Sequence, residues 1–252
     1  MALLALLSGW VAPAVADQLD AFAIADIEDR LGTALPLELA LENADGRPVR
    51  LGDLVGQRPA MLVPVDLDCQ NICGITLAGL FEALNDVQSR PGEDYELLVV
   101  SIDPKTRPAQ AHAARADYRK RFASASGASF LTGDAQPLLD RIGFRFAYDP
   151  ETDQYAHPAA VAVVNGEGRL ARWLYGYPFT AFDLRLALED AGGSEIGGLT
   201  DRLWQLCFRY DPKLGAYTPA ILDALKIGGV LTVLLIGGGI ALALRQERGR
   251  GK

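Results

Sequence analysis

The chain lacks an excess of basic residues. Its 24 Lys and Arg are outnumbered by 32 Asp and Glu, which gives a net charge of −8. Because binding to nucleic-acid phosphates requires a basic face, this composition argues against a nucleic-acid partner. An acidic surface serves solubility in most proteins, and it also suits a basic protein partner.

Cysteine and histidine are scarce as well, with 3 and 2 residues in a chain of 252. Any site built from sulfur and imidazole ligands therefore has few candidates. Cys69 and Cys73 lie close together, whereas Cys207 stands alone. The histidines are His112 and His157. No internal repeat is visible.

Basic residues are missing from the N-terminal segment, since none occurs before Arg30. The segment "MALLALLSGWVAPAVADQ" is a short apolar run that closes in Ala14-Val15-Ala16, the small-x-small pattern of a secretory cleavage site. We expect a signal peptide over residues 1–16, although its usual basic start is absent.

Charge is also missing from Ile227 to Leu244, which is 18 residues long and lies between Lys226 and Arg245. This length is enough for a helix to cross a bilayer, so we expect a transmembrane helix over residues 226–245. The basic tail at 246–252 places the C-terminus in the cytoplasm. The predicted location is a bacterial inner membrane, with the soluble body facing the periplasm. In such an oxidising compartment two cysteines can form a disulfide.

The body, residues 17–191, alternates apolar strand patterns with helical patterns. A connector over 192–225 follows it. Strands are predicted at 59–68, 95–103 and 128–134 and as a pair around the turn 165–168, with helices at 74–89, 108–122, 135–142 and 181–191. This order predicts an α/β fold with a central sheet and helices on both faces. The cysteine pair falls where the first of these strands passes into its helix, at the sheet edge where α/β folds place their sites.

Cys69 and Cys73 at the start of a helix present two sulfurs on one side, because residues i and i+4 share a helix face. The helix N-terminus favours thiolate over thiol. Two thiolates suit Cu(I), for which one imidazole would complete a three-coordinate site, and they equally suit a reversible disulfide. The spacing alone leaves a structural disulfide, a redox couple and a metal site open.

The two histidines differ in their surroundings. His112 lies in the charged helical stretch "AQAHAARADYRKR" and is expected on the surface, whereas His157 lies in a loop that enters a buried strand. Asp66 and Asp68 are expected to be solvated loop residues, with docking of a partner or a raised thiol pKa as the alternatives. Asp103 is expected to cap the turn after its strand. Cys207 is expected to be a small buried residue, with linkage of two chains or a visit to the copper site as the alternatives.

Several stretches resemble the SCO/SenC family of thioredoxin-like proteins. They cover the body from about Leu39 to Asp190 and include the cysteine pair with its helix, "VVSIDP" followed by "TRP", "FLTGD", "GFRFAYDP" and "YAHPAAVAVVNGEGRLARWLYG". The stretch "LCFRYDPKLGAY" before the predicted membrane helix resembles a bacterial branch of that family. The resemblance implies a thioredoxin-like fold and a role in copper delivery to cytochrome c oxidase.

Carried over by position, the family's copper ligands fall on Cys69, Cys73 and His157. The chain departs from the family at three neighbouring positions: Gln70 and Gly74 replace prolines, and Ala156 replaces an aspartate. The three ligands remain, so the resemblance implies a bound copper ion, Cu(I) or Cu(II). The replaced neighbours are expected to change the stiffness of the backbone at the cysteines and the orientation of the histidine ring.

The resemblance implies two functions. In the first, the chain is a copper chaperone whose partner is the cytochrome c oxidase subunit that carries a copper centre, with other copper chaperones or thiol reductases as further partners. In the second, Cys69 and Cys73 form the redox-active pair of a thiol-disulfide oxidoreductase that keeps the same subunit's cysteines reduced. A peroxidase is less favoured because Asp66-Leu67-Asp68 precedes the pair. A purely structural membrane-anchored domain leaves the cysteine helix unexplained.

Overall fold

The structure is a computed structural model that describes residues 24–67, 72–150, 152–176, 178–192, 208–211, 216–219, 229–232, 234, 236 and 237. Of residues 72 and 73 only the backbone is described. The predictions for the signal peptide, Asp68, Cys69 and Cys207 fall outside these ranges, as does most of the predicted membrane helix. Within the described ranges, no helix is both long and apolar enough to cross a membrane.

A seven-stranded mixed sheet forms the centre of the body. Its strands are β2 (Ala40–Asn43), β3 (Pro48–Arg50), β4 (Ala60–Val65), β5 (Glu96–Ser101), β6 (Ala128–Thr132), β10 (Ala160–Val164) and β11 (Leu170–Tyr175). Their order across the sheet is β11-β10-β4-β5-β6-β2-β3. The strands β4, β5 and β6 run parallel, and the outer strands pair antiparallel to their neighbours. Every residue of β4 and β10 is buried, as expected for central strands covered on both faces.

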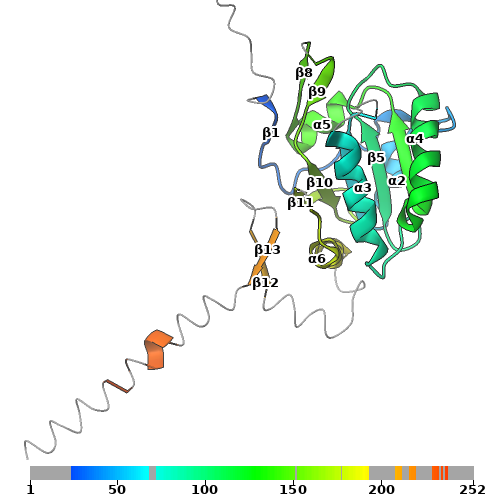
Figure 1. Cartoon of the computed structure of the whole chain (residues 1–252). Helices are drawn as coiled ribbons and strands as arrows, with labels where there is room; N and C mark the ends of the chain where they lie inside the picture. Colours follow the sequence, from blue (N-terminus) through cyan, green and yellow to red (C-terminus); the bar gives the residue numbers. More distant parts are fainter. Residues whose placement is uncertain are drawn as a thin grey trace, which may run out of the picture.

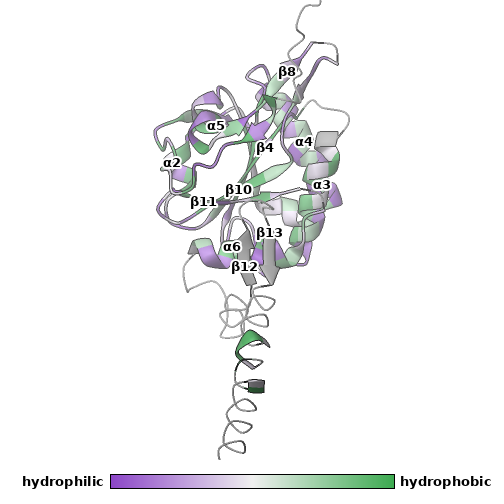
Figure 2. Cartoon of the chain, turned by 90° about the vertical axis from the view of Figure 1, so that its left-hand side faces the viewer, coloured by the Kyte–Doolittle hydropathy of each residue, from purple (hydrophilic) through white to green (hydrophobic). Residues whose placement is uncertain are grey.

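Helices cover both faces of this sheet, as the sequence predicts (Figure 1). They are α2 (Leu51–Leu54), α3 (Ile72–Asn85), α4 (Pro108–Arg121), α5 (Gln136–Ile142) and α6 (Ala181–Gly192). The longer helices α3, α4 and α6 pack on one face around Phe81, whereas α2 and α5 pack on the other face near Trp173. Figure 2 shows apolar segments of β4 and β10 inside the body and hydrophilic segments on its periphery.

Three small strand pairs were not predicted. The hairpin of β8 (Ala147–Asp149) and β9 (Gln154–Ala156) stands beside the sheet and leads directly to residue 157. At the N-terminal side, β1 (Asp26–Ile27) pairs with β7 (Phe144–Arg145) rather than with the central sheet. In the predicted connector, β12 (Phe208–Asp211) and β13 (Ala216–Pro219) form a further hairpin.

The cysteine helix starts earlier and ends earlier than its predicted range of 74–89. It begins at Ile72 and ends at Asn85. After that, the N–H groups of Asp86 and Val87 donate to Ala83 and Leu84, each at 3.2 Å. These i→i−3 hydrogen bonds tighten the chain into a short turn and stop the helix.

Candidate metal centre

The candidate site lies at the edge of the sheet where β4 and β5 end. Val65 and Ser101 are partners at the ends of these parallel strands, and the N–H of Ile102 donates to the Val65 carbonyl at 3.0 Å. Because β10 runs antiparallel to β4, the start of β10 lies beside the end of β4. The residues that follow β4 and the segment that precedes β10 therefore lie at the same edge.

The cysteine side of this edge is the first turn of α3. Cys73 is the second residue of the helix, and Cys69 lies outside the described residues. The backbone agrees with the predicted helix-N-terminal position for Cys73, where unpaired N–H groups favour thiolate. The carbonyl of Gly74, the next residue, accepts a hydrogen bond from the Tyr118 hydroxyl of α4 at 3.3 Å. This contact ties the first turn of the cysteine helix to its neighbour.

The histidine side is a half-buried imidazole on the segment between β9 and β10. The Nδ1 atom of His157 lies 3.0 Å from the carbonyl oxygen of Pro158. Since a carbonyl can only accept, Nδ1 carries the hydrogen and Nε2 carries the lone pair of the neutral ring. The Phe144 ring lies beside it, with ring centroids 6.2 Å apart. The backbone and one aromatic neighbour thus fix the ring in the form that ligates a metal.

Burial lowers the pKa of His157 below its ordinary value, because the charged imidazolium is poorly solvated there. The Pro158 carbonyl and the negative charge of Asp66 act in the opposite direction, but they do not outweigh burial. The imidazole is therefore neutral at neutral pH, as a metal ligand must be.

Acidic and phenolic groups surround the same edge. Asp66 directly follows β4 and is only 7% exposed, so the prediction that it is a solvated loop residue is wrong. The strand ends at Val65, earlier than its predicted range of 59–68, but burial extends one residue beyond it. The Tyr155 hydroxyl lies 3.4 Å from Oδ1 of Asp103, and burial and these two carboxylates raise the pKa of Tyr155.

Two further predictions are confirmed by the structure. Asp103 caps the turn after β5, because its Oδ1 accepts from the N–H of Lys105 at 2.9 Å. His112 is exposed on α4. Within the described residues, no group of three or more His, Cys, Asp or Glu side chains is placed to hold a metal ion. Cys69 lies outside these residues.

Sequence reasoning missed three residues that shape the site: Tyr118, Phe144 and Tyr155. Tyr155 lies in β9, two residues before His157, and this proximity was its one available signal. Tyr118 and Phe144 reach the site from elements distant in sequence. Nothing in their local patterns separates them from ordinary core aromatics.

Known proteins resemble this chain in sequence and in fold. A family model described as SCO1/SenC matches residues 31–178. Two solved structures from Aquifex aeolicus VF5 are similar at 25% identity. One, a putative electron transfer protein, has a TM-score of 0.59 over 66% of this chain and 96% of its own. The other, a putative electron transport protein, has a TM-score of 0.56 over 65% of this chain and 99% of its own.

Arabidopsis thaliana ScoI, crystallised with copper bound, is 20% identical, with a TM-score of 0.47 over 60% of this chain and 90% of its own. No curated protein matches the chain. The matched family segment covers more than half of the chain and contains the strand before the cysteines, the cysteine helix and His157. The chain belongs to the SCO1/SenC family.

Proposed function

We propose that the chain is a copper-binding chaperone that delivers copper to the copper centre of a cytochrome c oxidase subunit. The thiolates of Cys69 and Cys73 and the Nε2 atom of His157 would hold one Cu(I) ion as cargo. The observation that best supports this proposal is the state of His157. Its Nδ1 donates to the Pro158 carbonyl and its pKa is lowered, so the ring offers a neutral Nε2 at the sheet edge from which the cysteine helix starts.

The chemistry of this donor set fits Cu(I). Two thiolates are soft, negatively charged ligands, and one neutral imidazole completes a three-coordinate site. Because soft Cu(I) prefers sulfur, the imidazole is the weakest of the three ligands and leaves first when thiolates of the acceptor approach. The cargo then passes by exchange of one ligand at a time.

The same proposal includes the placement of the chain in the cell. A signal peptide over 1–16, a thioredoxin-like domain over 17–191, a connector over 192–225, a membrane helix over 226–245 and a cytoplasmic tail over 246–252 would hold the domain at the periplasmic face of a bacterial inner membrane. The apolar runs at both ends and the four basic residues after position 244 support this arrangement.

A second function uses the same cysteines without copper. Cys69 thiolate would attack a disulfide of the oxidase subunit, and Cys73 thiolate would then attack Cys69 in the mixed disulfide. The subunit leaves with both thiols reduced, and this chain keeps the disulfide, so two electrons have passed. The start of α3 just before Cys73 favours this chemistry, and the two Aquifex relatives are described as putative electron transfer and electron transport proteins.

Anaerobic titration of the reduced, metal-free full chain with Cu(I) against a competing chelator separates the two functions. We expect one tightly bound copper ion, loss of binding in Cys69→Ser, and clearly weaker binding in His157→Ala. His112→Ala is the matched control, because it removes an exposed histidine from α4 and should leave the affinity unchanged.

Weak copper binding in the unaltered chain, together with no effect of His157→Ala, would contradict copper delivery. The reduction potential of the cysteine pair would then become the informative quantity, because a dithiol reductase does not need His157.

A further inference from the structure

A cavity of about 780 Å³ lies on the side of the sheet edge that carries His157. It lies between residues 25–31 of the N-terminal segment and the chain at residues 158–159 and 173–176. Pro158 and Ala159 directly follow His157, and the Pro158 carbonyl is the group that accepts from the His157 ring. Whatever binds in this cavity therefore touches the same stretch of backbone that orients the histidine.

The course of the N-terminal segment creates this space. Its residues 32 and 33 pair with β11 at Leu170, where the N–H of Gly32 donates to the Leu170 carbonyl at 2.8 Å. Toward the N-terminus the segment leaves β11 and joins β7 as β1. Between these two anchor points it passes over the second half of β11, which is an edge strand of the sheet.

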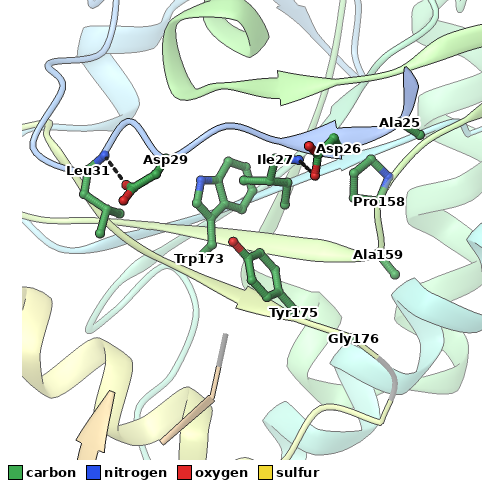
Figure 3. Close-up of a pocket in the computed structure, with 10 residues that line it drawn as sticks. All are labelled: Ala25, Asp26, Ile27, Asp29, Leu31, Pro158, Ala159, Trp173, Tyr175 and Gly176. Atoms are coloured by element: carbon green, nitrogen blue, oxygen red, sulfur yellow. Dashed lines mark hydrogen bonds between the residues drawn. The ribbon is translucent and has the colours of Figure 1, made fainter. Parts of the chain in front are cut away.

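The floor and walls of the cavity are apolar and aromatic. Figure 3 shows Trp173 and Tyr175 projecting from β11 toward the segment that carries Ile27 and Leu31. Leu31 is 41% exposed, one of the few large apolar side chains of the body at the surface. Trp173 is only 2% exposed and forms the floor, whereas Tyr175 is half-buried. The aliphatic part of a side chain can therefore pack on this surface, with a cation over the ring of Tyr175.

The polar groups of the cavity carry negative charge. Asp26 and Asp29 line it, and both are exposed. Each accepts a hydrogen bond from a nearby backbone N–H, at 2.8 Å from Ile27 and 3.3 Å from Leu31, but neither forms an ion pair within the described part of the chain. The carboxylate between them behaves differently, because Glu28 pairs with Arg30 and Arg145. None of the described residues that line the cavity is basic.

We infer that this cavity is the docking site for a Lys- or Arg-bearing segment of the protein that receives the copper. The aliphatic stem of the basic side chain packs on the half-buried Tyr175, above the buried Trp173, and its charge meets Asp26 and Asp29. The inference rests on the proposed function for the identity of the partner. A second copy of the chain is disfavoured as the occupant, since it carries the same net charge of −8.

The first test uses the metal-free full chain in detergent and a fluorescein-labelled peptide in which two lysines alternate with valines. Fluorescence anisotropy should show binding that weakens with salt. The matched peptide with norleucine in place of lysine keeps the stem but loses the charge, and it should bind more weakly. Asp26→Asn with Asp29→Asn should weaken binding of the lysine peptide by about fivefold or more, because two ion pairs are lost.

The asparagine substitutions suit this test, because the amide oxygen can still accept the two backbone hydrogen bonds. Asp53→Asn with Asp86→Asn is the control, since it changes the net charge equally at exposed positions outside the cavity. Equal affinity of the cavity variant and the control variant would overturn the inference. So would equal binding of the lysine and norleucine peptides.

The second test asks whether the occupant is the copper acceptor. A dithiol peptide with flanking lysines should take Cu(I) from the loaded chain faster than its norleucine counterpart. The cavity variant should remove this difference while its Cu(I) affinity stays that of the unaltered chain. If the transfer rate is the same for the lysine and norleucine peptides and for the unaltered chain and the cavity variant, the copper acceptor is not the occupant of the cavity. Because the first test uses no copper, failure of the proposed function is seen separately, in the Cu(I) titration.

The chain's own basic tail is the competing occupant. Replacing Arg245, Arg248, Arg250 and Lys252 with glutamine should leave the affinity for the lysine peptide unchanged if a partner fills the cavity. Tighter peptide binding by this variant would show that the tail occupies the site, and it would overturn the inference.

Discussion

The two sides of the candidate metal centre hold their ligands in different ways. On the cysteine side, the first turn of α3 is held from a distance, because Tyr118 donates to Gly74 across 44 positions of sequence. On the histidine side, the ring is held locally, because His157 bonds to the carbonyl of the very next residue. Each side lacks a residue that the family resemblance leads one to expect, a proline at Gly74 and an aspartate at Ala156.

This difference indicates where each side can be perturbed. The Tyr118–Gly74 hydrogen bond is lost when the distant residue Tyr118 changes or moves. The cysteine side therefore depends on the packing of α3 against α4. The hydrogen bond from His157 to the adjacent Pro158 carbonyl does not depend on distant residues. The orientation of the imidazole plane, however, also depends on an aromatic ring packed beside it. The histidine side therefore depends on Phe144, which lies on the opposite face of the sheet from Tyr118.

The largest expected effect is that of Phe144→Ala. Phe144 is 1% exposed and packs on Trp173 with ring centroids 5.9 Å apart, as well as beside His157. We expect a loss of about 3–5 kcal/mol in the free energy of unfolding, measured by chemical denaturation. Cu(I) binding should weaken too, because the ring that flanks the imidazole is gone.

Phe81→Ala is the matched control on the cysteine side, since Phe81 is fully buried and packs on Tyr118 at 5.3 Å. Its effect on copper affinity should persist in a His157→Ala background, whereas that of Phe144→Ala should vanish there. Equal effects of Phe144→Ala with and without His157 would remove the distinction between the two sides. Phe144→Leu serves the copper measurement where the alanine variant does not fold.

Tyr118→Phe should have a smaller effect. It removes one hydrogen bond and leaves the aromatic packing of Tyr118 in place, so we expect a loss of about 1 kcal/mol in stability. The thiol-disulfide equilibrium of the cysteine pair with glutathione should shift toward the dithiol, because a looser turn holds the two sulfurs together less well.

Tyr148→Phe is the control for this substitution. The Tyr148 hydroxyl bonds Asp153 on the exposed β8–β9 hairpin, at 2.5 Å, and lies on the histidine side. An equal redox shift in the two variants would show that Tyr118 does not position the cysteine turn.

The same comparison explains how far the sequence could predict the structure. The strands β4 and β5 and the helices around them follow from apolar runs and helical spacing, and Asp103 was placed correctly at its turn because Asp-Pro motifs act locally. The β8–β9 hairpin was missed because strands of three residues leave no periodic pattern.

Contacts between distant segments could not be predicted at all. The Tyr118–Gly74 hydrogen bond and the Phe144–His157 contact depend on how helices and loops pack on the sheet, and no local pattern encodes them. Asp66 was misjudged for the same reason, since its burial comes from the surrounding structure and not from its own residue type.

Gly74→Ala should change stability slightly, and in the favourable direction. A Cβ at Gly74 would lie 3.8 Å from the Tyr118 hydroxyl, which is an ordinary contact, and alanine is a better helix former than glycine. We expect a gain of about 0.5–1 kcal/mol, measured by thermal and chemical unfolding.

Gly143→Ala provides the contrast near the histidine side. Gly143 has φ +79°, and a Cβ there would lie 2.4 Å from the Glu28 carbonyl oxygen, so this substitution should destabilise. A destabilising Gly74→Ala would mean that the first turn of α3 needs the freedom of glycine, and the Tyr118–Gly74 hydrogen bond would then not be its main constraint.

The smallest effect concerns the charge beside the histidine. The Asp66 carboxylate raises the pKa of His157 against the stronger lowering by burial, so Asp66→Asn should lower this pKa further. An NMR titration of the metal-free chain measures this directly, with the exposed His112 as an internal control. A lower pKa keeps the imidazole neutral to lower pH, so protons would compete with Cu(I) for Nε2 only under more acidic conditions. A His157 pKa that stays the same or rises would mean that Asp66 does not act on the ring. The local hydrogen bond to Pro158 and the packing of Phe144 would then account for the histidine side without any charged neighbour, which would make the contrast with the tethered cysteine side sharper.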